Sequence, residues 1–200
     1  MTSIYLVRHG ETAWNAEGRF QGQSDTPLNE KGKQQANALG QHFKGKGLTA
    51  IYTSDLQRAW ETARIIGSYH TLAIMKHSGL REMSFGSWEG MDYDQIQDRY
   101  PDELASWQNN ILTTSPPGGE NLEQLAIRVQ VVYDHICQKH KNDILLVVAH
   151  GGVIQVMLCM ALELSPHEYW HFHIDPGSLS EIAIYPEGVI LNRLNITFDE

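Results

Sequence analysis

The chain has 200 residues, 42% of them hydrophobic and 9% aromatic, which is the composition of an ordinary globular protein. A formal net charge of −9 disfavours nucleic acid and anionic membranes as partners, so an anionic ligand would need a local cluster of cationic groups. No apolar run is long enough to span a bilayer, and the opening MTSIYLVRHG lacks the basic segment of a signal peptide. We therefore expect a cytoplasmic protein.

Predicted strands and helices alternate along the chain. Apolar runs predict strands, and apolar residues at helical spacing predict helices, with Asn29 as one N-cap and the SDLQ sequence at Ser54 as a capping box for the next helix. In chain order, these elements are a strand at 3–7, a helix at 29–43, a strand at 48–54, a helix from Ser54 to about Tyr69, a strand at 72–77, a helix at 120–140, a strand at 143–150, a helix at 152–164, and a hairpin of strands at 178–185 and 188–196.

The segment around residues 91–118 has a different character. It contains short helical pieces, aromatic residues and a break at SPPGG. We interpret about 83–118 as a small cap-like insertion within a single domain that spans 1–200. Two roles are open for its aromatic side chains: they line the pocket for a leaving group, or they form a small core of the cap. The residues concerned are Trp88, Tyr93, Tyr100 and Trp107.

The alternation predicts an α/β layered fold with a mostly parallel sheet, in which ligands bind at the carboxyl ends of the strands. Arg8 and His9 end the first strand, and His150 ends the most apolar one, so they should meet at one edge. Arg58, in the first turn of a helix, and Glu82, after the third strand, can reach the same edge. Each of these residues alone would more often be structural or exposed. Cys137 and Cys159 lack metal-ligand spacing, and we expect them to be buried free thiols.

Several sequence blocks together resemble the histidine phosphatase superfamily, which includes the cofactor-dependent phosphoglycerate mutases. The blocks LVRHGET, TPLNEKGKQQA, YTSDLQRAWETA, LREMSFGSWEG, PPGGEN and LLVVAHGGVI occur in the family's order. Within it, the chain is most similar to alpha-ribazole-5'-phosphate phosphatases and their broad-specificity relatives. The resemblance implies a three-layer fold whose doubly covered, mostly parallel sheet has one antiparallel strand near an edge, with a small helical cap insertion.

The resemblance also implies roles for particular residues. His9 matches the nucleophile that becomes phosphorylated, and Glu82 matches the proton donor. Three further residues match those that hold the phosphoryl oxygens, namely Arg8, Arg58 and His150. Apart from the resemblance, we expect His150 to be protonated there, because its charge would help the two arginines to neutralise these oxygens. Residues expected to contact the substrate are Asn15, Gln21, Gly22 and Gly151.

We expect a metal-independent phosphomonoesterase without a cofactor, because cationic side chains can neutralise the phosphoryl oxygens. The expected substrate is a small phosphorylated metabolite such as alpha-ribazole 5'-phosphate, which would place the protein in cobalamin biosynthesis. The alternatives are a phosphoglycerate mutase, a broad-specificity phosphatase of sugar phosphates, and a non-catalytic module that binds a phosphorylated ligand. The sequence gives no indication of the oligomeric state.

Overall fold

The computed structural model describes residues 1–198. Its strands are β1 (Thr2–Arg8), β2 (Ala50–Thr53), β3 (Ile74–Lys76), β4 (Ile144–Ala149), β5 (Leu179–Tyr185) and β6 (Gly188–Ile196). Its α-helices are α1 (Ala13–Ala16), α2 (Glu30–Phe43), α3 (Gln57–Gly67), α4 (Tyr93–Arg99), α5 (Pro101–Asn109), α6 (Leu122–Lys139) and α7 (Gly151–Ala161). Short 3-10 helices are η1 (Ser78–Leu80), η2 (Gly86–Trp88) and η3 (Pro166–His171).

The strands form one six-stranded sheet in the order β3-β2-β4-β1-β5-β6. Strands β1, β2, β3 and β4 pair in parallel. Strand β5 is antiparallel to both of its neighbours, β1 and β6. It is therefore the one reversed strand, next to the edge, and the predicted topology is confirmed.

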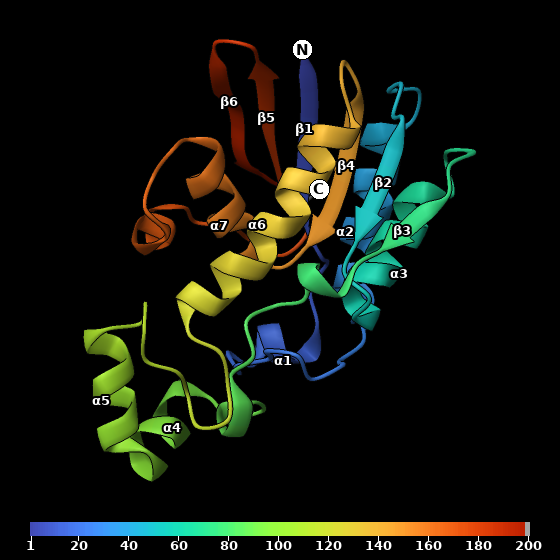
Figure 1. Cartoon of the computed structure of the whole chain (residues 1–200). Helices are drawn as coiled ribbons and strands as arrows, with labels where there is room; N and C mark the ends of the chain where they lie inside the picture. The colour runs from blue at the N-terminus through green and yellow to red at the C-terminus, as the bar shows by residue number, and fades with distance from the viewer. Residues whose placement is uncertain (199–200) are drawn as a thin grey trace.

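Both faces of the sheet are covered by helices (Figure 1). In β4, Leu145 and Val147 pack in the cluster that contains α6 and α7. The alternate residues Leu146 and Val148 pack in the second cluster, with α2 and α3. Because a strand buried on both faces has apolar residues at every position, the run ILLVVA fits this central place. The predicted three-layer architecture is confirmed.

Residues 83–118 contribute α4 and α5, which lie together beyond the lower end of the sheet in Figure 1. They enclose a small apolar cluster built on fully buried Trp88, with Ile96 and Leu104. Trp107 packs edge-on against Trp88, with ring centroids 5.6 Å apart. Tyr93 is 46% exposed. Trp88 therefore has the second of the two roles left open for these aromatic residues: it forms part of a small core.

The capping box predicted at Ser54 is wrong. Helix α3 begins at Gln57 with Leu56 as N-cap and without a side-chain cap bond from it. Instead, the Ser54 hydroxyl accepts a hydrogen bond from the Leu56 amide, and the Gln57 amide donates to Asp25 Oδ1 at 2.6 Å. A carboxylate from a distant loop thus takes the place of the local cap, and the helix starts later.

Cys137 and Cys159 are free thiols, as expected, although Cys137 is only partly buried. None of the helices in the described part of the chain is long and apolar enough to cross a membrane.

Candidate active site

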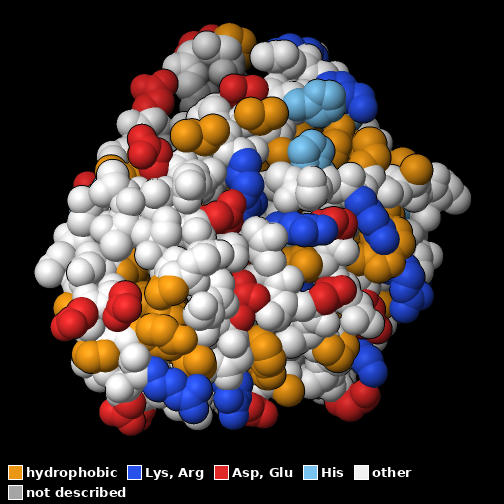
Figure 2. Space-filling view, turned by 60° about the horizontal axis from the view of Figure 1, so that its bottom comes forward, with side chains coloured by type: hydrophobic (Ala, Val, Ile, Leu, Met, Phe, Trp, Pro, Cys, Tyr) orange, Lys and Arg blue, Asp and Glu red, His pale blue; other side chains and the backbone are white. Residues whose placement is uncertain are grey.

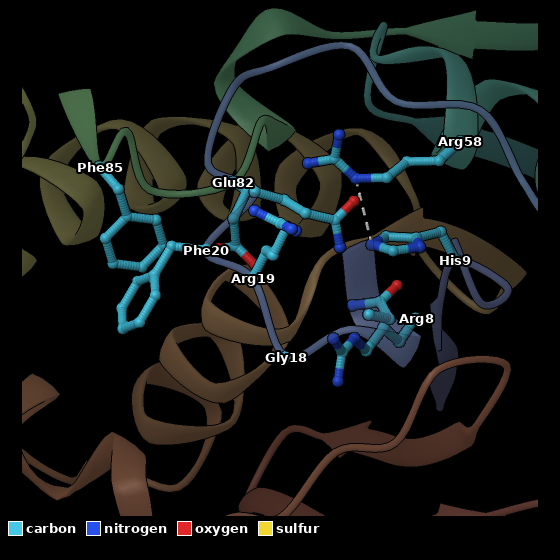
Figure 3. A pocket seen from close by; sticks show the side chains of 10 residues that line it. Arg8, His9, Gly18, Arg19, Phe20, Arg58, Glu82 and Phe85 are labelled. Carbon is cyan, nitrogen blue, oxygen red and sulfur yellow. Dashed lines mark hydrogen bonds between the residues drawn. The ribbon is translucent and has the colours of Figure 1, made fainter. Parts of the chain in front are cut away.

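A pocket of about 240 Å³ opens at the carboxyl end of β1. Its lining includes six of the predicted site residues, and four further residues complete it (Figure 3). The six are Arg8, His9, Asn15, Gln21, Arg58 and Glu82, and the four are Gly18, Arg19, Phe20 and Phe85. Three predicted residues lie outside this lining: His150 is buried beside His9, Gly151 faces the Arg8 guanidinium, and Gly22 holds Arg58 through its carbonyl.

His9 directly follows β1 and is only 2% exposed. Its Nδ1 lies 2.7 Å from the carbonyl of Gly10, which can only accept, so Nδ1 carries the proton. Its Nε2 accepts a bond from Arg58 Nε at 3.2 Å and therefore keeps a lone pair (Figure 3). Burial, followed by the positive charges of Arg58 and Arg8, holds the pKa of His9 well below its usual value. The imidazole is consequently neutral near pH 7.

Arg58, the second residue of α3, is completely buried. Its Nη1 and Nη2 donate to the carbonyls of Ser24 and Gly22, at 2.7 and 2.6 Å. Burial lowers the pKa of Arg58 to about 10, so it remains charged at neutral pH. These bonds fix the guanidinium and leave a proton on each terminal nitrogen for a ligand.

Glu89 holds the loop that supplies those two carbonyls. Its carboxylate accepts from the amides of Gln23 and Ser24, at 2.9 and 2.8 Å, and from the Ser24 hydroxyl at 2.6 Å. Gly22 has φ of +54°, and a Cβ there would collide with the Glu89 carboxylate. The glycine predicted to contact substrate is thus required for the close approach of Glu89.

Arg8 and His150 complete the cationic side of the site. Arg8 Nη1 donates to the carbonyl of Ile174 at 2.6 Å, while its buried Nε has no partner among the described residues. Both ring nitrogens of His150 are likewise buried and unpartnered within residues 1–198. Burial, and then Arg58, lowers the pKa of His150 well below its usual value. Burial, and then the charges of Arg58, His9 and Arg8, therefore disfavour the protonated ring in this structure, and a protonated His150 with phosphate bound stays a prediction.

Glu82 enters the pocket from the loop after β3. Its Oε1 accepts from the Met83 amide at 3.0 Å, and Oε2 accepts from the Gly152 amide, in the first turn of α7, at 3.3 Å. Asn15 and Gln21 use their amide oxygens internally, accepting from the Thr12 amide and from the Thr12 hydroxyl. Their amide nitrogens are left to donate to a ligand.

Sequence reasoning missed Gly18, Arg19 and Phe20, although the same GRFQG run contains the predicted Gln21 and Gly22. Arg19 Nη1 donates to the carbonyl of Gly90 at 2.6 Å. Phe20 packs edge-on against Phe85, with centroids 4.9 Å apart, and this pair lies opposite His9 and Arg58 in Figure 3. On the molecular face that comes forward in Figure 2, acidic and basic side chains are mingled rather than segregated.

In the described part of the chain, no three His, Cys, Asp or Glu side chains are grouped so as to hold a metal ion. Two histidines near the C-terminal part of the chain pair with carboxylates: His171 with Glu168 at 2.7 Å and His173 with Asp175 at 2.9 Å.

Comparison with known proteins identifies the family. Residues 4–197 match the histidine phosphatase superfamily (branch 1). The chain belongs to this superfamily. Over 98% of its length it is 32% identical to phosphoserine phosphatase 1 of Hydrogenobacter thermophilus, and the match covers 93% of that protein. This relative, with the family match, identifies the chain as a phosphatase of the superfamily.

Two solved structures are also similar to it. The alpha-ribazole phosphatase of Shigella flexneri gives a TM-score of 0.91 at 28% identity, covering 97% of this chain and 96% of that one. Phosphoserine phosphatase of Entamoeba histolytica, in complex with 3-phosphoglyceric acid, gives 0.83 at 30% identity, covering 98% of both chains.

Proposed function

We propose that this member of the superfamily is a metal-independent phosphomonoesterase that works through a phosphohistidine on His9. The observation that carries the proposal is the neutral His9, whose unprotonated Nε2 accepts a hydrogen bond from Arg58 Nε beside a pocket lined by Arg8 and Arg58. A phosphate monoester carries about −1.5 to −2 charges near neutral pH, and it repels an anionic nucleophile but not a neutral imidazole. The unpartnered N–H groups of the site are suited to its oxygens.

In the first step, His9 Nε2 attacks phosphorus and the bond to the ester oxygen breaks. Arg8, Arg58 and His150 bind the equatorial oxygens, with the amides of Asn15 and Gln21 as further donors. Arg58 Nε gives up its bond to Nε2 as the N–P bond forms. Protonated Glu82 gives its proton to the departing alkoxide.

In the second step, water attacks phospho-His9. Glu82, now ionised, takes a proton from the water, and the N–P bond breaks to release inorganic phosphate and neutral His9. No redox partner or metal enters this balance.

For the substrate we propose alpha-ribazole 5'-phosphate, an intermediate that would place the protein in cobalamin biosynthesis. The Phe20–Phe85 pair offers an apolar surface to a flat leaving group, and the fold resembles an alpha-ribazole phosphatase at a TM-score of 0.91. Phosphoserine is a second candidate, because Arg19 lines the pocket and, although its Nε is paired with Glu17, a guanidinium has further N–H groups for a substrate carboxylate. Sugar phosphates, hydrolysed with broad specificity, are the third candidate class of substrate.

The decisive experiment measures hydrolysis of these esters together with phosphoglycerate isomerisation, in wild type and His9→Ala. We expect hydrolysis to exceed isomerisation greatly and His9→Ala to retain the fold but lose turnover and phosphoenzyme formation. Substantial turnover by His9→Ala would refute the mechanism, and efficient isomerisation primed by bisphosphoglycerate would establish a mutase. Arg19→Met should lower kcat/KM for phosphoserine more than for alpha-ribazole 5'-phosphate. A cytoplasmic location remains a prediction, which cell fractionation would test.

A further inference from the structure

The segment that carries Glu82 has little regular structure of its own. Residues 81–85 connect η1 to η2 without belonging to a helix or strand. A side chain on such a segment is placed by tertiary contacts rather than by the repeating geometry of an element. The position of Glu82 in the pocket therefore depends on what holds this backbone.

Arg128, in the middle of α6, makes most of the side-chain hydrogen bonds that fix this backbone. Its Nη1 donates to the carbonyls of Gly79 and Arg81 at 3.0 and 2.6 Å, and its Nη2 donates to the carbonyl of Glu82 at 2.8 Å. One guanidinium thus donates to three of the four carbonyl oxygens of residues 79–82. Arg128 lies outside the pocket lining, although its charge is one of those that lower the pKa of the buried His150.

Glu120, from the PPGGEN block, fixes Arg128 in turn. Its two oxygens accept from Arg128 Nε at 2.9 Å and Nη2 at 2.8 Å, a bidentate pair whose side chains are 23% and 21% exposed. Glu120 Oε2 also accepts from the Ser84 amide at 2.9 Å. Burial raises the pKa of Glu120, but the hydrogen bonds from Arg128 and Ser84 outweigh it and the pKa is lowered overall. The carboxylate is thus charged at neutral pH.

The glycines of the same block allow this close approach. A Cβ on Gly119 would stand 2.5 Å from the Ser84 carbonyl oxygen. The Glu120 amide donates to that same oxygen at 2.8 Å. Backbone contact on one side and the ion pair on the other therefore hold both flanks of Glu82.

We infer that the Arg128–Glu120 ion pair positions Glu82 for proton transfer to the leaving group. Gln23 extends this hold: its Nε2 donates to the Glu82 carbonyl at 3.2 Å, while its backbone amide is bound by Glu89. The inference rests on the proposed function for the role of Glu82. Because a displacement of about 1 Å can cost about 10²-fold in rate, a loosened segment should impair protonation without removing the acid itself.

The test compares Arg128→Met, Arg128→Lys and Glu120→Gln with wild type. Arg193→Met is the matched control, since it breaks an ion pair with Glu181 on the far β5–β6 edge of the sheet. Three quantities are measured: turnover of an alkyl phosphate, the burst of p-nitrophenolate from p-nitrophenyl phosphate, and vanadate affinity. Hydrogen–deuterium exchange across residues 79–84 measures how firmly this backbone segment is fixed, independently of enzymatic activity.

We expect Arg128→Met to lower alkyl-ester turnover about 10²-fold while the nitrophenolate burst and vanadate affinity stay near wild type. Lysine should restore little, because an ammonium cannot make the planar bidentate pair and also reach three carbonyls. Exchange across 79–84 should rise in all three variants and stay unchanged in the control. If Arg128→Met does not fold, the same measurements on Arg128→Lys and Glu120→Gln test the inference.

Unchanged alkyl-ester turnover, an equal loss for both esters, or unchanged exchange across 79–84 would overturn the inference. Wild type that hydrolyses none of the esters would instead refute the proposed function. In that case the exchange measurement still decides whether the ion pair holds the segment.

Discussion

Replacing Glu82 by glutamine should separate the two halves of the proposed reaction. The change removes the proton that the leaving alkoxide needs, but the side chain keeps its length. General acid catalysis contributes about 10² to 10⁴-fold, so alkyl-ester turnover should fall about 10³-fold, equivalent to about 4 kcal/mol. A nitrophenolate leaving group departs without protonation, so its release from the first step should be nearly unaffected.

The fold should tolerate this substitution. The two carboxylate oxygens of Glu82 accept bonds from the amides of Met83 and Gly152, and a glutamine can keep one of them through its carbonyl. The other amide would face an NH₂ group, which costs about 1 to 3 kcal/mol for an unpaired polar group if it stays buried. The loss in the free energy of unfolding should therefore be small beside the loss of activity.

Rapid mixing with p-nitrophenyl phosphate provides the assay. Because Glu82 also serves as base in the second step, Glu82→Gln should give one nitrophenolate per active site in a fast burst and then stall as phospho-His9. Exposed Glu123→Gln, in the first turn of α6, is the control and should behave as wild type. Loss of the burst with retained vanadate affinity would refute the assignment of Glu82 as acid and base.

Three further predictions follow from the same geometry. Activity should persist in excess chelator and be inhibited by vanadate, since arginines take the place of a metal; a requirement for added divalent metal would contradict the mechanism. The free energy of unfolding should fall as pH drops below about 6.5, by up to about 1.4 kcal/mol per pH unit for each of His9 and His150. The cause is that histidines of the unfolded chain bind protons at this pH while the two buried rings stay neutral. Thermal unfolding should show a smaller slope with pH in His150→Ala than in wild type, and an equal slope would refute this prediction. Glu89→Ala should weaken vanadate binding about tenfold by freeing the loop that orients Arg58, and it should lower the free energy of unfolding by about 1 to 3 kcal/mol. Calorimetry of vanadate binding, with exposed Glu103→Ala as the control, would test this, and an unchanged affinity would contradict it.

The layers of the fold and the edge that carries the site could be predicted because both depend on local pattern. The continuous apolar run before His150 indicates a strand covered on both faces, and the position of Arg8 and His9 after another strand places them at the same end of the sheet. Each inference uses only neighbouring residues and the period of a strand. The structure brings these groups together as expected, with the rings of His9 and His150 5.1 Å apart.

Features that depend on distant partners could not be predicted in this way. The start of α3 is fixed by Asp25, which lies 32 residues from Gln57. A lowered pKa of His150 follows first from its burial and then from the charges of Arg58, His9 and Arg8 around it. No periodicity in the sequence records how closely those cations approach a buried ring, so its protonation state required the three-dimensional arrangement.

The supports of the site show why its motifs extend beyond the groups that face the pocket. Glu89, in FGSWEG, holds the loop that orients Arg58, and Glu120, in PPGGEN, holds the arginine that fastens the segment of Glu82. Both carboxylates are bound by backbone amides, and neither lines the pocket. A pocket formed from loops needs such anchors, because loop backbone has no ladder of hydrogen bonds to hold a catalytic group within the short distances that proton and phosphoryl transfer require.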